Sequence, residues 1–161
     1  MPDQRFVRVP QEDEINLMFT PSRHQARDLF FDTWEKYQSG RKLEGLETTV
    51  LDIVLLHPEY HAVLSDREMY IDRDYVPESG TLNPFLHLSL HLAVAEQLAM
   101  DQPPGISELF DGLTTRHGDR HVALHVVLEC LAETVWKANR SGAPPDQHAY
   151  LGCLREHRDK T

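Results

Sequence analysis

The chain has 161 residues, of which 40% are hydrophobic and 26% are charged, and its formal net charge is −10. At this length about two thirds of the unfolded surface can be buried, so a single domain with a real core is expected. A negative surface repels phosphate backbones and anionic lipid heads, which argues against nucleic acid and the membrane as partners.

The longest apolar run, around residues 50–56, is far shorter than the roughly 20 residues that span a bilayer. The N-terminal sequence MPDQRFVRVPQEDE lacks the apolar core of a secretory signal, so we expect a soluble, cytoplasmic protein with reduced thiols. The two cysteines, Cys130 and Cys153, form no CxxC motif. We therefore expect neither a disulfide framework nor a thiolate zinc knuckle, and a metal would rely on nitrogen and oxygen ligands.

The N-terminal part of the chain is interrupted by prolines and then begins a helix. Residues 1–21 contain three prolines and indicate a flexible N-terminal arm. Ser22 is the predicted N-cap of a helix that ends near residue 38, before Ser39 and Gly40. A second helix is expected over about residues 43–57, and Pro58 either kinks it or starts a new turn that ends at Ser65.

The rest of the pattern predicts three more main helices and no strand. Residues 66–81 indicate a long surface connection, and Asn83 followed by Pro84 predicts the start of a helix that ends near residue 100. DQPPG and SGAPPD are predicted breaks. Further helices are expected over about 106–115, 119–140 and 146–157. We predict an all-α helical bundle of four long helices with short additional ones, in one domain over residues 22–158.

Six of the 10 histidines form three pairs with a spacing of four residues: HPEYH at 57 and 61, HLSLH at 87 and 91, and HVALH at 121 and 125. This spacing brings two side chains to one face of a helix, where two imidazoles can share a metal ion.

Helical wheels place the first two pairs on apolar faces and the third at the edge of one. Glu96 falls on the side of its helix opposite to its histidines, which makes it a poor ligand candidate. Glu129 and Glu133 lie progressively further outward from the apolar stripe of their helix, and Glu133 is left open as a ligand. The predicted metal ligands are His57, His61, His87, His91, His121, His125, Glu47 and Glu129.

Several of these motifs resemble a known family. LEGLE, HPEYH, NPFLHLSLHLAVAEQ, DQPPGI and HxxxHxxxECLAExxW are similar to the bacterial family called domain of unknown function 1841, over most of residues 22–155. The resemblance implies that all eight predicted ligands belong to the family pattern. It implies no activity, substrate or cofactor.

Two kinds of function fit this pattern. Buried imidazoles need polar partners, and shared coordination would satisfy many of them at once. We therefore predict a non-haem metalloprotein with one or two ions, preferably a di-iron centre that acts in the chemistry or sensing of oxygen species; with zinc, it would be a hydrolase or transferase. The alternative is a non-enzymatic structural or interaction protein with a buried histidine network, which binds a protein partner through its acidic surface or N-terminal arm.

Overall fold

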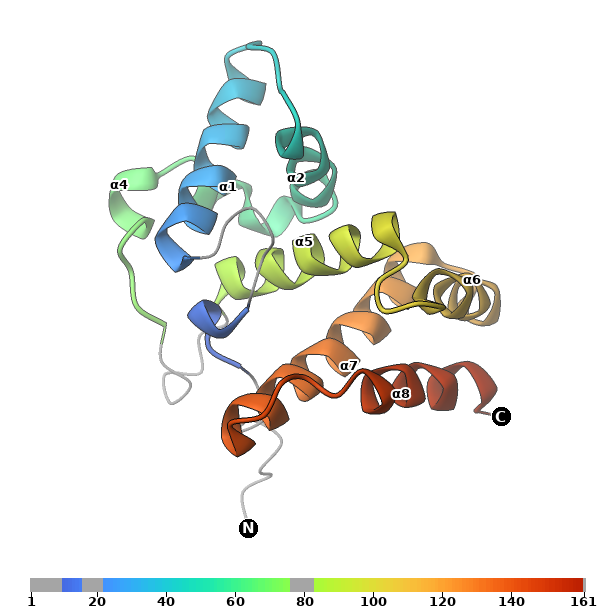
Figure 1. Ribbon diagram of the computed structural model, residues 1–161. Coiled ribbons are helices and arrows are strands. Elements are labelled where there is room, and N and C mark those ends of the chain that lie inside the picture. The colour runs from blue at the N-terminus through green and yellow to red at the C-terminus, as the bar shows by residue number, and fades with distance from the viewer. Residues whose placement is uncertain (1–9, 16–21, 76–82, 161) are drawn as a thin grey trace. The chain divides into compact units, whose positions relative to one another are not determined.

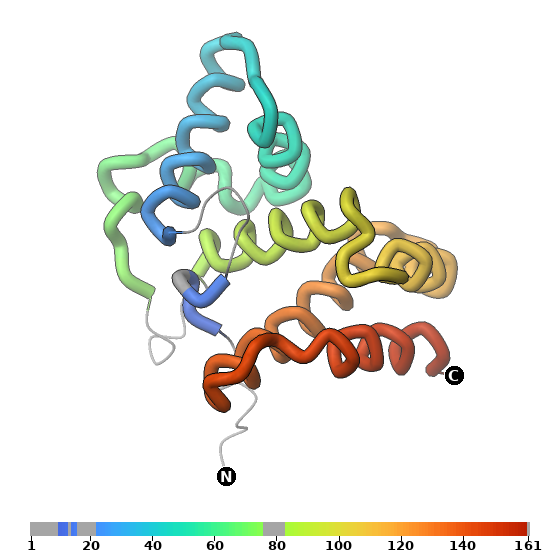
Figure 2. The backbone as a smooth tube through the Cα atoms, viewed as in Figure 1, coloured from blue at the N-terminus to red at the C-terminus, as the bar shows by residue number. Residues whose placement is uncertain are grey.

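The computed structural model describes residues 10–15, 22–75 and 83–160 (Figures 1 and 2). All regular elements in these ranges are helices, which confirms the predicted all-α class. The chain divides into two compact units: one comprises Ile15–Leu92, and the other comprises Ala93–Thr161 with the N-terminal residues Met1–Glu14. The boundary falls inside helix α5 (Pro84–Met100).

Most of the predicted N-terminal arm lies outside the described residues. Its described part contains one short 3₁₀ turn, η2 (Glu12–Glu14). The side chains of Glu12 and Ile15 are buried, so this part of the arm is packed.

The first unit contains α1 (Arg23–Gln38), α2 (Leu46–Leu55), η3 (Pro58–Tyr60), α3 (His61–Leu64), α4 (Arg67–Tyr70) and the first half of α5. The Ser22 side chain accepts a hydrogen bond from the Gln25 backbone N–H, as its predicted capping role requires. Helix α1 ends at Ser39 and the chain turns at Gly40, whose φ of 71° favours glycine.

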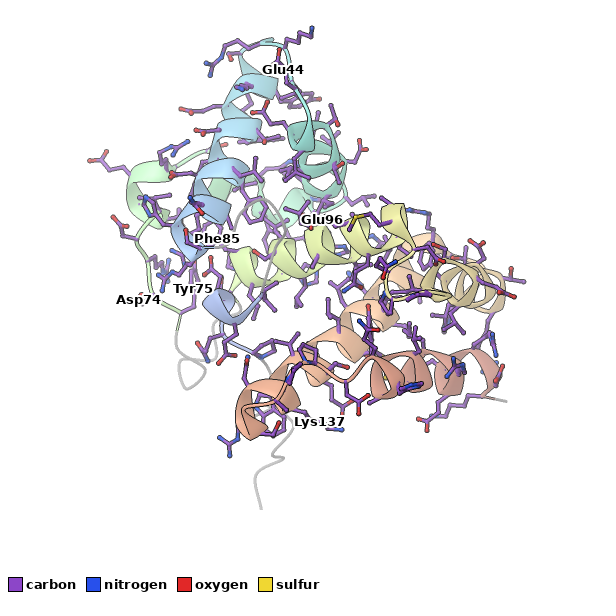
Figure 3. All side chains as sticks on the ribbon, viewed as in Figure 1. Glu44, Asp74, Tyr75, Phe85, Glu96 and Lys137 are labelled. Atoms are coloured by element: carbon purple, nitrogen blue, oxygen red, sulfur yellow. A yellow bond between two sulfur atoms is a disulfide. The ribbon has the colours of Figure 1, made fainter. Side chains whose placement is uncertain are left out.

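Aromatic side chains join α1 to α5 in the core of this unit. Phe31 is fully buried, and its ring centroid lies 5.5 Å from that of Phe85. Phe85 and Tyr75, both labelled in Figure 3, have ring centroids 6.2 Å apart. The buried Arg27 lies over the Phe85 ring, with its Cζ 4.5 Å from the centroid.

Arg27 also anchors part of the segment 66–81, which was predicted to be a surface connection. Its Nη1 donates to the backbone carbonyls of Tyr70, Ile71 and Arg73 at 2.8–3.2 Å. Residues 66–75 are therefore only partly a surface loop, since they contain α4 and are anchored to a buried guanidinium; residues 76–82 lie outside the described part. A buried arginine is stable only when its donors are used in this way.

The second unit contains α6 (Ile106–His117), α7 (Arg120–Ser141), α8 (Gln147–Asp159) and the end of α5. Helices α6, α7 and α8 pack against one another in pairs (Figure 1). Asp119 and Asp146 cap α7 and α8 by accepting backbone N–H groups with their side chains. The Tyr150 hydroxyl of α8 donates to Gln97 Oε1 of α5 at 2.6 Å.

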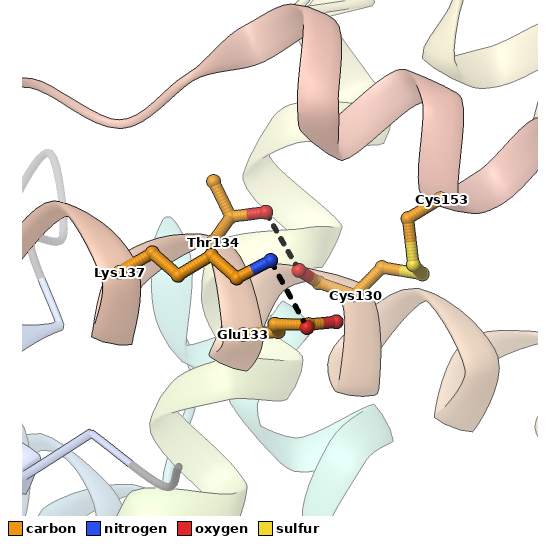
Figure 4. Close-up of a disulfide and its surroundings, with 5 residues drawn as sticks. All are labelled: Cys130, Glu133, Thr134, Lys137 and Cys153. Carbon is orange, nitrogen blue, oxygen red and sulfur yellow. Dashed lines mark hydrogen bonds and ion pairs between the residues drawn. A yellow bond between two sulfur atoms is a disulfide. The ribbon is translucent and has the colours of Figure 1, made fainter.

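The expectation of two reduced cysteines is wrong for this structure. Cys130 of α7 and Cys153 of α8 form a disulfide, with an S–S distance of 2.03 Å and a Cα–Cα distance of 5.9 Å (Figure 4). The absence of a CxxC motif does not prevent this pairing, because α7 and α8 pack antiparallel and bring the two residues together across 23 positions of sequence.

Candidate metal centre

The site begins at the end of α2, where HPEYH interrupts the helix. The helix predicted over about residues 43–57 is α2, which is shorter at both ends, since it begins at Leu46 and ends at Leu55. The residue before a proline avoids helical backbone angles, and His57 has φ −127° and ψ 66°. Pro58 then starts the new turn η3, which was the second of the two predicted outcomes.

Both histidines of HPEYH turn back to the last carbonyl groups of α2. His57 Nδ1 lies 2.7 Å from the Ile53 carbonyl oxygen, and His61 Nε2 lies 2.8 Å from the Val54 carbonyl oxygen. The same two carbonyl oxygens also accept the backbone N–H groups of Leu56 and His57, so each imidazole uses the second lone pair of its carbonyl oxygen. The two imidazoles thereby supplement the C-terminal cap of α2, a role that the sequence analysis missed.

The capping hydrogen bond fixes which nitrogen of His57 is available as a ligand. A carbonyl oxygen only accepts, so Nδ1 of His57 carries the proton that it donates to Ile53. In the neutral ring, Nε2 then has the lone pair. Histidine ligands of metals typically donate their second nitrogen to a carbonyl or carboxylate in this way, which orients the ring.

Helix α5 brings two further imidazoles to His57. His87 and His91 are one helical turn apart, and the ring centroid of His57 lies 4.9 Å from that of His87 and 4.5 Å from that of His91. The ring nitrogens of these three residues that could serve as ligands all lie within 4.8 Å of one another. We call His57, His87 and His91 the histidine cluster; all three belong to the first unit.

The distances in the histidine cluster suit a transition metal ion. His57 Nε2 and His87 Nε2 are 3.2 Å apart. Two imidazole nitrogens bound tetrahedrally to one ion at about 2.05 Å would be separated by about 3.3 Å. The observed separation also fits a hydrogen bond between the rings, in which His87 donates to His57.

The surroundings of the histidine cluster are largely closed to solvent. His57 and His91 are 2% and 3% exposed, whereas His87 is half-buried and provides the more accessible edge. The Tyr60 ring stacks on His57 at 5.7 Å, with an interplanar angle of 10°. Burial, followed by the charge of Glu59, raises the pKa of Tyr60, so its hydroxyl stays protonated at neutral pH.

Two predicted ligands of the first unit make other contacts. His61 uses Nε2 on the Val54 carbonyl, and its ring packs on Trp34 with centroids 4.3 Å apart. Glu47 forms an ion pair with Lys36, whose Nζ lies 2.7 Å from Oε2, and its Oε1 also accepts from the backbone N–H of Glu44. Neither residue is in the histidine cluster.

The other predicted ligands belong to the second unit. His121 and His125 lie on α7, with ring centroids 4.3 Å apart, so the spacing of four residues brings this pair together as predicted. Glu129 is exposed on the same helix. The proposed role of these three residues as metal ligands remains a prediction.

The fold and the cluster define an all-α protein with an imidazole-rich core. None of the described helices combines the length and apolar character needed to cross a membrane. A family model described as "Domain of unknown function (DUF1841)" matches residues 22–156, and the chain belongs to this family. This confirms the resemblance inferred from the motifs. No match was found among curated proteins or among solved structures.

Proposed function

We propose that this protein is a non-haem metalloprotein in which the histidine cluster holds a first-row transition metal ion. The observation that supports the proposal best is the hydrogen bonding of the His57 ring. Its Nδ1 proton is used on the Ile53 carbonyl, so Nε2 presents a lone pair 3.2 Å from His87 Nε2 and within 4.8 Å of a ligand nitrogen of His91.

The ligand set favours a single ion in the first unit. Three imidazoles are the protein ligands of an open catalytic zinc site, in which the fourth position takes water or substrate. A binuclear iron centre normally also needs carboxylates, and Glu47 is engaged with Lys36. The di-iron hypothesis therefore depends on ligands beyond the histidine cluster.

The metal decides the class of chemistry. Imidazole binds iron, zinc, copper and nickel, so the cluster by itself does not select among them. Bound iron would supply redox chemistry or sensing of oxygen species, and bound zinc would supply an activated water for hydrolysis or group transfer. In both cases His57 and His91 would be the buried ligands, and the half-buried His87 would be the most accessible of the three.

The test is elemental analysis of the chain purified without a polyhistidine tag and without added metal. We expect about one ion per chain, because three imidazoles provide one set of protein ligands. His57→Gln, His87→Gln and His91→Gln should each lose most of it. His24→Gln is the matched control, since His24 is an exposed histidine of the same unit, with a side chain that is 65% exposed.

His61→Gln separates capping from coordination. It should lower the unfolding free energy and leave the metal content unchanged, because His61 caps Val54 and packs on Trp34 outside the cluster. The same series includes His121→Gln and His125→Gln to test the predicted α7 ligands. Negligible metal in repeated preparations, together with no thermal shift on adding iron or zinc, would leave the histidines as a hydrogen-bond network and overturn the proposal.

A further inference from the structure

A second group of possible ligands lies around the disulfide of the other unit. Cys130 of α7 and Cys153 and His157 of α8 have ligand atoms that all lie within 4.8 Å of one another. His157 follows Cys153 by four residues on one helix, so both side chains lie on the same face of α8. Cys130 is 1% exposed, and Cys153 and His157 are partly exposed.

The disulfide lies beside an open groove between α7 and α8. The groove has a volume of about 1040 Å³, and Cys153 is one of its lining residues, together with Glu133, Lys137 and Glu156. Figure 4 shows Glu133 and Lys137 of α7 near the bond. A thiol reductant that enters this groove would reach the bond from the Cys153 side.

We propose that reduction of the Cys130–Cys153 disulfide converts this group into a zinc site with two thiolates and one imidazole. A dithiol reductant donates two electrons and two protons: its own thiols become a disulfide, the protein S–S bond breaks, and Cys130 and Cys153 become thiols. Both thiols then release their protons to the solvent as they bind the ion. His157 supplies the third ligand and water the fourth.

The chemistry makes the site dependent on redox state. Thiolates are strong ligands for zinc, whereas disulfide sulfurs carry no charge and bind it poorly. The oxidised chain therefore excludes the ion, and the reduced chain provides the Cys₂His set of an open zinc site. These residues are separate from the histidine cluster, so this proposal does not depend on the proposed function.

The test uses the full chain, reduced with a phosphine and desalted without oxygen, and titrated with Co²⁺ as a spectroscopic substitute for Zn²⁺. We expect thiolate-to-cobalt charge-transfer absorption in the near ultraviolet, which Zn²⁺ abolishes by displacing Co²⁺. A site made only of imidazoles cannot give this absorption, so cobalt bound at the histidine cluster does not interfere. The oxidised chain should show none.

His157→Gln and His148→Gln form a matched pair, since both histidines lie on α8 and only His157 belongs to the group. We expect His157→Gln to weaken Co²⁺ binding at least about tenfold, because even the loss of outer-shell partners costs 10–100-fold. His148→Gln should bind as the wild type does. Cys153→Ser should remove most of the charge-transfer absorption.

Circular dichroism checks whether the reduced chain stays helical. If helicity falls on reduction, its recovery with Zn²⁺ in the wild type but not in His157→Gln supports the proposal, and no recovery overturns it. A reduced, helical chain without the charge-transfer absorption also overturns it. Equal affinity in His157→Gln and the wild type would show that the assigned ligand set is wrong.

Discussion

Reduction of the disulfide should destabilise the protein by an amount that follows from the length of the loop it closes. The bond joins positions 23 residues apart. In the chain-entropy treatment, a loop of this length restricts the unfolded state by about 11 cal/mol/K, or about 3 kcal/mol at 25 °C. Reduction removes no atom of either side chain, so it leaves no cavity beside the buried Cys130, as a substitution by a smaller residue would.

The assay is urea unfolding of the oxidised and reduced chain, followed by far-ultraviolet circular dichroism with a chelator present. With an m value of about 1–3 kcal/mol/M, the midpoint of the reduced chain should be lower by about 1–3 M. Cys153→Ala is the control, because its midpoint should not respond to the reductant. Equal midpoints for the oxidised and reduced wild type would refute the argument that the closed loop stabilises the fold.

Three further perturbations follow from contacts in the two units. Phe31→Ala should lower the free energy of unfolding in urea by about 3–5 kcal/mol, because Phe31 is 0% exposed and packs on the Phe85 ring. A decrease below about 1 kcal/mol would contradict the assignment of Phe31 to the core. Lys36→Met should raise the pKa of Glu47, which the hydrogen bond from Lys36 holds below its ordinary value of 4.5, and carboxyl NMR titration measures it. Because the pKa of Glu47 is lower in the folded than in the unfolded chain, this carboxylate stabilises the folded wild type above pH 4.5. That stabilisation is lost as the pH falls through the folded pKa, so the unfolding free energy of the variant should depend less on acid than that of the wild type. Tyr150→Phe should cost about 1 kcal/mol, because the hydrogen bond to Gln97 disappears, and an unchanged unfolding free energy would contradict that bond's contribution.

The first residues of most helices could be predicted from the sequence, because N-capping is a local interaction. Ser22 accepts a hydrogen bond from a backbone N–H three residues ahead, and Asn83 accepts two, from residues two and three ahead. Asp119 and Asp146, where the last two main helices were expected to begin, act in the same way. Such contacts depend on a few neighbouring residues, which the sequence contains in full.

Contacts between distant segments could not be read in the same way. The carbonyls that Arg27 binds are 43–46 residues away, and nothing near Arg27 in the sequence indicates them. The disulfide likewise requires α7 and α8 to pack with Cys130 opposite Cys153. Spacing of four residues correctly predicted that His87 and His91 share a face of α5, but not which other histidine they would meet.

HPEYH shows why spacing without the local backbone gives an incomplete prediction. A spacing of four residues treats His57 and His61 as equivalent, whereas α2 ends at Leu55, before His57, and Pro58 starts η3 between the two histidines, so their rings make different hydrogen bonds. His57 donates from Nδ1 and keeps Nε2 toward α5, while His61 donates from Nε2, the atom farthest along its ring, and packs its face on Trp34. In the proposed metal site, the hydrogen bond to Ile53 would orient the His57 ring before an ion binds, which would lower the entropy cost of coordination. For His61, the hydrogen bond to Val54 leaves Nδ1, the nitrogen nearer the backbone, as the unprotonated nitrogen of the neutral ring, and this ring packs on Trp34 outside the histidine cluster.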